Sequence, residues 1–154
     1  MSKLLRATLA IGLVLSLVAA GGCGGDTQKK NDYVKAINKV QTDFANAASK
    51  LQAGGAGSGE AGAKKTFANL KAAIDKVVAD LQGVKPPDSV KALHNELIGE
   101  MKSFGQSIQR AGASLGSKDP QKILAAQTQF ATDAGQVGAK IGATIDKINT
   151  ELHK

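Results

Sequence analysis

Apolar side chains recur every three or four residues through four long segments, and this spacing restricts the folds open to the chain. The segments span about residues 32–53, 60–83, 87–116 and 120–152. Such spacing places the apolar side chains on one face of an α-helix. In the first segment this face comprises Tyr33, Ile37, Val40, Phe44, Ala47 and Leu51. A chain of 154 residues suits one small domain, so we predict an all-α fold, an antiparallel up-down-up-down four-helix bundle that buries the four faces.

Glycine and proline separate these segments. Residues 54–62 contain five glycines, and we expect a loop there. The pair Pro86-Pro87 ends the second segment, and Asp88 suits the positive end of the next helix. Residues 117–120, Ser-Lys-Asp-Pro, combine a capping side chain with proline at the first helical position, so they predict the last turn.

The expected helices differ in length, at about 22, 24, 30 and 33 residues. At 1.5 Å per residue, the last two would project by on the order of 10 Å at the end away from the N-terminus. We expect a partner to meet this end. Its candidate surface residues are Arg110, Lys118 and Asp119.

The N-terminus has the organisation of an export segment. Lys3 and Arg6 precede residues 7–20, an apolar run of 14 residues. A helix of that length covers about 21 Å, which is short of the roughly 30 Å of hydrocarbon in a bilayer. We therefore predict a signal peptide over residues 1–22.

Residues 20–23, Ala-Gly-Gly-Cys, resemble the lipobox of bacterial lipoproteins. The resemblance implies a diacylglyceryl group on the sulfur of Cys23, palmitate or another fatty acid on the anchor, and cleavage before this residue. Two or three acyl chains hold a protein on a membrane far better than one. The alternative is a plain secretory cleavage site after residues 18–20, Val-Ala-Ala, which would leave Cys23 as an unpaired thiol.

The whole chain is similar to small helical lipoproteins of high-GC Gram-positive bacteria. This resemblance rests on the lipobox, a short glycine-containing segment after it, four helices rich in small residues, and Pro86-Pro87 followed by His94. It implies a location on the outer face of the cytoplasmic membrane, and it does not point to any particular activity. Residues 23–31 would be the acylated cysteine and a flexible tether, and residues 32–154 the bundle.

The charge of the chain bears on its partners. The formal net charge is +7, and removal of the signal peptide would take away the charges of Lys3 and Arg6. Lysines are spread along all segments and the chain has only five aromatic residues, one Tyr and four Phe, which does not favour a nucleic-acid partner. The membrane, through the lipid anchor, and an envelope protein or anionic polymer are the partners we expect.

Residues suited to catalysis do not occur in a supporting pattern. Cys23 is the one cysteine and His94 one of two histidines, so we expect no metal site, no cofactor and no enzymatic activity. Acidic residues such as Asp43, Asp75, Glu100 and Asp146 fall mostly on polar helix faces, where solvation or pairing at i, i+4 is expected. For His94, packing beneath the preceding turn competes with binding of a ligand.

Glycines inside the expected helices need a physical reason, because each costs roughly 0.5–1 kcal/mol relative to alanine. Gly135, Gly138 and Gly142 form a stripe on the fourth helix, and the third helix carries Gly105, Gly112 and Gly116. Close backbone packing is one interpretation. The other is a groove between the third and fourth helices. The sequence thus supports a non-enzymatic interaction or structural module of the envelope, or alternatively a binding protein for a small apolar ligand or lipid.

Overall fold

The computed structural model of the chain describes residues 25–53, 59–117 and 119–154. This part contains four long helices, α2 (Gly25–Ala53), α3 (Gly59–Gly83), α4 (Lys91–Ser114) and α5 (Pro120–Leu152). A short 3-10 turn, η1 (Asp88–Val90), precedes α4. The described residues contain no strand, and the predicted all-α helical bundle is confirmed.

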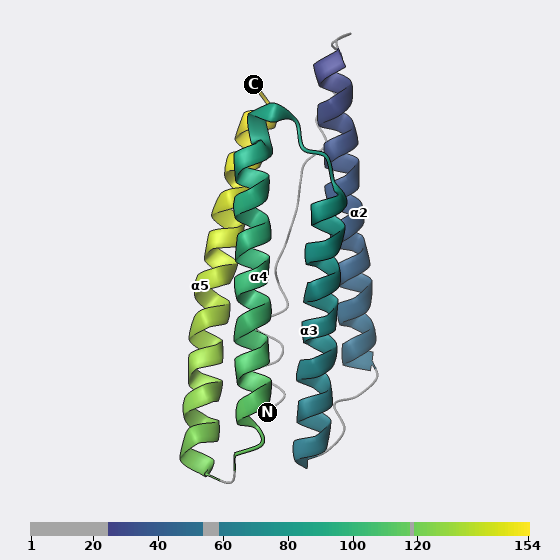
Figure 1. The fold of residues 1–154 in the computed structure, drawn as a ribbon. Helices are drawn as coiled ribbons and strands as arrows, with labels where there is room; N and C mark the ends of the chain where they lie inside the picture. Colours follow the sequence, from purple (N-terminus) through teal and green to yellow (C-terminus); the bar gives the residue numbers. More distant parts are fainter. Residues whose placement is uncertain (1–24, 54–58, 118) are drawn as a thin grey trace.

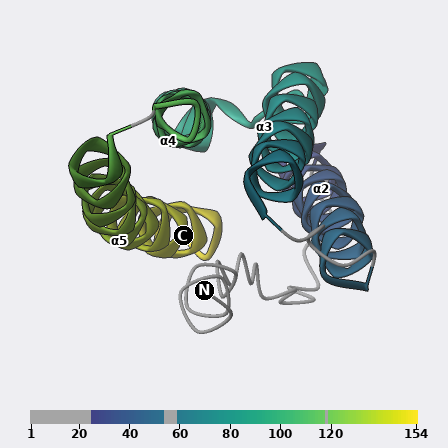
Figure 2. The same ribbon diagram turned by 90° about the horizontal axis from the view of Figure 1, so that it is seen from below.

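Consecutive helices run in opposite directions along the bundle, as the colour gradient makes visible (Figure 1). Each helix packs closely on the next one in the chain, α2 on α3, α3 on α4 and α4 on α5. The first and last helices, α2 and α5, do not form such a close pair. Seen along their axes, the helices form a curved row in chain order (Figure 2).

The apolar helix faces meet in one core that is more completely buried toward the turn between α3 and α4. Ile37, Leu97 and Ile148, from α2, α4 and α5, are fully buried in it. Burying an aliphatic side chain of this size contributes roughly 1.5–3 kcal/mol, so these contacts hold the helices together. Phe67 and Phe130 pack on the same core but remain partly exposed, and their rings meet edge to face with centroids 5.4 Å apart.

The two turns that flank α4 contain proline and a capping side chain as predicted, but the start of α4 differs from the prediction. The third helix was expected from residue 87, but Pro87 only caps η1, and α4 begins at Lys91. The tighter turn brings the fully buried Val90 into the core while its N–H donates to the Pro87 carbonyl at 3.1 Å. At the last turn, the side chain of Asp119 accepts a hydrogen bond from the Gln121 N–H at 2.9 Å, as the capping prediction requires.

Helix α2 begins earlier than the sequence suggested. It starts at Gly25, so residues 25–31, expected as a flexible tether, are helical. The negative charge of Asp26 in the first turn stabilises the positive end of the helix dipole. Gln28 Nε2 donates a hydrogen bond to Asp32 Oδ1, one turn further along the helix, at 3.0 Å. Cys23 itself lies outside the described residues.

The prediction that the third helix projects beyond the second was wrong. Helix α4 has 24 residues and α3 has 25, so α4 is not the longer of the two. Helix α3 begins at Gly59, which makes residues 59–62 of the expected loop helical, and a Glu60–Lys64 ion pair of 2.6 Å supports this first turn. The rest of that expected loop, residues 54–58, lies outside the described residues.

Glycines on α4 serve close packing against α3. A Cβ added at Gly112 would lie 3.1 Å from the Cβ of Phe67, and one added at Gly105 would lie 3.4 Å from a methyl group of Ile74. The first distance is tighter than an ordinary van der Waals contact. Gly112 therefore allows α3 and α4 to approach, which confirms the packing interpretation for this position.

Replacing glycine by alanine should have different effects on the two helices. We expect Gly135→Ala and Gly142→Ala each to raise the free energy of unfolding by about 0.5–1 kcal/mol, because the new methyl group meets nothing within 4 Å and the helix gains propensity. Gly112→Ala is the matched control and should gain nothing, because Phe67 must shift. Urea denaturation measures all three, and an equal gain for Gly112→Ala would contradict this packing account.

Candidate functional site

Two members of the expected partner surface lie among the described residues, and both already serve the fold. Arg110 donates from Nη2 to Ser107 Oγ at 2.8 Å and to Asp133 Oδ2 at 3.0 Å. Its side chain is nevertheless 64% exposed. Asp119 is the N-cap of α5. Lys118, the third member, lies outside the described residues.

Asp133 forms a polar link between α4 and α5. Its Oδ2 accepts from Ser107 Oγ at 2.8 Å, and its Oδ1 accepts from Gln129 Nε2 at 2.7 Å. The hydrogen bonds from Gln129, Ser107 and Arg110, in decreasing order, hold the pKa of Asp133 below its ordinary value. Because the carboxylate is satisfied from both helices, it fixes their register.

The glycine stripe of α5 lies beside open space. Asp133 and Thr144 bond to α4, and at 3.6 residues per turn Gly135, Gly138 and Gly142 fall on the other flank of the helix. A Cβ added at any of the three would meet nothing within 4 Å, so close packing does not explain them. These glycines do not face a groove between the third and fourth helices as expected, because they lie on the flank of α5 turned away from α4, where Gly135 and Gly142 are exposed.

A groove of about 580 Å³ lies between α2 and α3 and was not anticipated from the sequence. It is open to solvent and is formed by polar and apolar side chains of both helices and the following turn. The lining residues are Asp32, Tyr33, Ala36, Lys39, Val40, Asp43, Lys76, Ala79, Asp80, Gly83, Val84 and Lys85.

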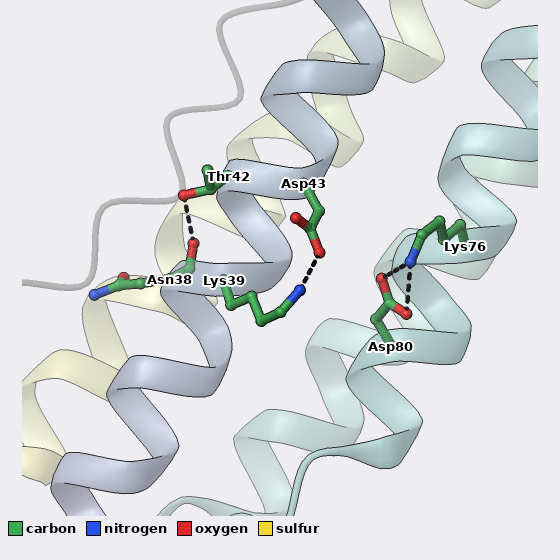
Figure 3. Close-up of polar contacts among 6 residues, drawn as sticks. All are labelled: Asn38, Lys39, Thr42, Asp43, Lys76 and Asp80. Atoms are coloured by element: carbon green, nitrogen blue, oxygen red, sulfur yellow. Dashed lines mark hydrogen bonds and ion pairs between the residues drawn. The ribbon is translucent and has the colours of Figure 1, made fainter.

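Four charged side chains of this groove form what we call the charge quartet, Lys39, Asp43, Lys76 and Asp80 (Figure 3). Lys39 and Asp43 on α2 pair at 2.6 Å, and Lys76 and Asp80 on α3 pair at the same distance. Because the helices run in opposite directions, Asp43 faces Lys76 and Lys39 faces Asp80 (Figure 3).

The charges of the quartet interact between the two helices as well as within α2. The hydrogen bond from Lys39 lowers the pKa of Asp43, and the charge of Lys76 lowers it further. The hydrogen bond to Asp43 raises the pKa of Lys39, and the charges of Asp43 and Asp80 add to this. Each charge is met by an opposite one, so the quartet is suited to clamping α2 onto α3.

A buried tyrosine and histidine connect the groove to the core. Tyr33, which lines the groove, and His94 are only 1% and 2% exposed. His94 Nε2 lies 3.0 Å from the carbonyl oxygen of Leu81, and Nδ1 lies 3.2 Å from the Tyr33 hydroxyl. A carbonyl only accepts, so we assign the imidazole proton to Nε2, and the Tyr33 hydroxyl donates to Nδ1. The expected packing role of His94 is confirmed.

Burial favours the neutral form of both rings. Loss of water lowers the pKa of His94, although the hydrogen bond to Leu81 opposes this shift. Burial raises the pKa of the Tyr33 hydroxyl far above its ordinary value. Neutral His94 satisfies both ring nitrogens with groups from α2 and α3.

The four acidic residues expected on polar faces do not all behave alike. Asp43 and Asp75 pair at i, i+4 as predicted, the latter with Lys71 at 2.6 Å. Glu100 instead contacts α5, because its Oε1 accepts from Thr144 Oγ1 at 3.1 Å, while its buried Oε2 has no hydrogen-bond partner among the residues that the structure describes. Burial raises the pKa of this carboxyl, and the Thr144 hydrogen bond opposes the change.

The described residues contain no cluster of three or more His, Cys, Asp or Glu side chains that could hold a metal ion. None of the described helices combines the length and apolar character needed to cross a membrane. No protein-family model, curated protein or solved structure matches the chain. Lys-x-x-x-Asp spacing occurs at residues 39–43 and 76–80, which line the groove, but also at residues 71–75, which do not, so this spacing alone could not have located the groove.

The cross-helix part of the charge quartet can be tested by exchanging charges. The double variant Lys39→Asp, Asp43→Lys keeps an ion pair within α2 but sets like charges opposite each other across the groove. We expect it to lower the thermal unfolding midpoint. The matching exchange on α3, Lys76→Asp with Asp80→Lys, should restore the midpoint when both are combined, whereas additive losses would show that the helices do not couple here.

His94 should make stability depend on pH. The unfolded chain binds the imidazole proton near pH 6.5, and the folded chain binds it only at lower pH. The free energy of unfolding should therefore fall as the pH drops below about 6.5, by at most about 1.4 kcal/mol per pH unit, and level off below the folded pKa.

The control for this pH dependence is His94→Asn, which should remove it in denaturation series from pH 8 to pH 5 (about the range in which histidine titrates). Tyr33→Phe should lower stability by about 1–3 kcal/mol at high pH, because it leaves His94 Nδ1 buried without a donor. An unchanged pH profile in His94→Asn would rule out this imidazole as its source.

Proposed function

We propose that the chain is a lipid-anchored protein on the outer face of the cytoplasmic membrane, acting as a non-enzymatic interaction or structural module of the cell envelope. The observation that carries the proposal is the small-residue sequence directly before Cys23, at the end of an apolar run of 14 residues. Acylation at this sulfur would hold the bundle at the bilayer surface without a spanning helix.

The geometry of α2 supports a short and defined attachment. Helix α2 begins at Gly25, two residues after Cys23. The start of α2 lies at the same end of the bundle as the turn between α3 and α4 and the C-terminus (Figure 1). In the anchored protein this end would lie nearest the membrane, and the opposite end would face envelope proteins or anionic polymer.

Binding of a small apolar ligand or lipid is a second candidate function. The observation that favours it is the open space beside Gly135, Gly138 and Gly142. Val137 and Phe130, on the same helix, are only partly buried. A ligand that co-purifies with the chain in native mass spectrometry, and is lost from Gly138→Leu, would favour this function over the first.

The anchor is tested by Cys23→Ser in a bacterial host that processes lipoproteins. We expect the wild-type chain to incorporate labelled palmitate and partition into the detergent phase of Triton X-114, and the variant to lose both properties. Ala20→Leu is the matched control and should retain both, because leucine fits the lipobox at this position. Unchanged labelling and partitioning in Cys23→Ser would overturn the proposed function.

A further inference from the structure

The positive charge excess of the chain is concentrated at one end of the bundle. We call the end formed by residues 44–53, 59–68, 105–117 and 119–129 the loop end (Figure 1). Its described residues carry five cationic side chains, Lys50, Lys64, Lys65, Arg110 and Lys122, and two anionic ones, Glu60 and Asp119. The net formal charge of the loop end is therefore +3.

The opposite end has no positive excess. Residues 25–34, 74–97 and 143–154 carry seven cationic and eight anionic side chains, a net formal charge of −1. This distribution could not be read from the sequence, where lysines are spread along every segment. Folding brings the end of α2 together with the basic start of α3, and the start of α5 lies at the same end of the bundle, on the far side of α4 (Figures 1 and 2).

Three lysines of the loop end are available to a partner. Lys50, Lys65 and Lys122 lie on α2, α3 and α5, are exposed, and form no ion pair within the described residues. The acidic groups nearby are engaged, Glu60 with Lys64, Asp119 as the cap of α5, and Asp133, just outside these ranges, with Arg110. The unpaired charge at this end is thus entirely positive among the described residues.

We propose that the loop end binds a linear anionic polymer outside the cell, one whose phosphate or carboxylate groups repeat along the chain. Single exposed lysines hold single anions weakly in salt solution. The three free lysines stand on three different helices, so a flexible polyanion can engage several of them at once and gain from multivalency.

Orientation favours a polymer over anionic lipid, and this step rests on the proposed function. If Cys23 is anchored, α2 separates the loop end from the bilayer. Its 29 residues correspond to about 44 Å, several times the Debye length of roughly 8 Å at physiological salt. The lipid surface would therefore attract the loop end little, whereas a polymer that extends from the membrane can reach it.

The test is binding of the full chain in detergent to fluorescently labelled polyphosphate and polyglutamate, followed by anisotropy. The triple variant Lys50→Gln, Lys65→Gln, Lys122→Gln should bind about tenfold more weakly, and binding should weaken as salt is added. Each single replacement should weaken binding by a smaller step. The polymer that binds more tightly identifies phosphate or carboxylate as the recognised group.

A matched control removes the same charge from the other end. The triple variant Lys85→Gln, Lys91→Gln, Lys147→Gln should bind like the wild-type chain, and circular dichroism melts verify that both triple variants fold. Equal losses in the two triples, no binding to either polymer, or tighter binding to phosphatidylglycerol vesicles through the same three lysines would overturn the proposal. Cys23→Ser should bind the polymer normally, so failure of the anchor is distinguishable.

Discussion

A single buried imidazole constrains how the first three helices of the bundle meet. His94 on α4 receives a hydrogen bond from Tyr33 on α2 and donates one to the Leu81 carbonyl on α3. A buried polar group without a partner costs about 1–3 kcal/mol. An arrangement of the three helices that leaves either ring nitrogen without its partner is therefore disfavoured by about that amount. The apolar faces supply most of the attraction between helices. The imidazole adds a geometric constraint on how α2, α3 and α4 meet.

The two ends of the bundle differ in how completely the core is buried and in net charge. Around His94 the core is closed, with residues such as Ile37 and Ile148 fully buried, and beside it the charge quartet sets opposite charges of α2 and α3 facing each other. Toward the loop end the aromatic rings of Phe67 and Phe130 remain partly exposed and positive charge gathers. A rigid, nearly neutral end beside the proposed anchor and a basic end away from it suit a module that contacts other envelope components.

Charged residues show which side-chain contacts can be predicted from spacing along the sequence and which cannot. The i, i+4 spacing of Asp43 and Asp75 predicted their ion pairs correctly, because both partners lie on one helix. The same reasoning failed for Glu100, whose partner Thr144 comes from another helix. It also gave no sign of the groove between α2 and α3, because the facing of Lys39 toward Asp80 depends on two helices packing in opposite directions. The expected tether was wrong for a different reason, because its polar residues form a local i, i+4 contact, Gln28 to Asp32, within α2.

The sequence by itself determined the four helices, the proline-containing turns and the cap at Asp119, because these depend on residues a few positions apart. It also contains the lipobox-like residues on which the proposed location rests. Only the tertiary structure decided that α2 and α5 do not pair closely. It also decided that Gly112 packs against Phe67, whereas a Cβ at Gly135 would meet nothing within 4 Å. Finally, it placed unpaired lysines from three helices at the same end of the bundle. These features are relations between residues distant in the chain, and side-chain packing across helices fixes them.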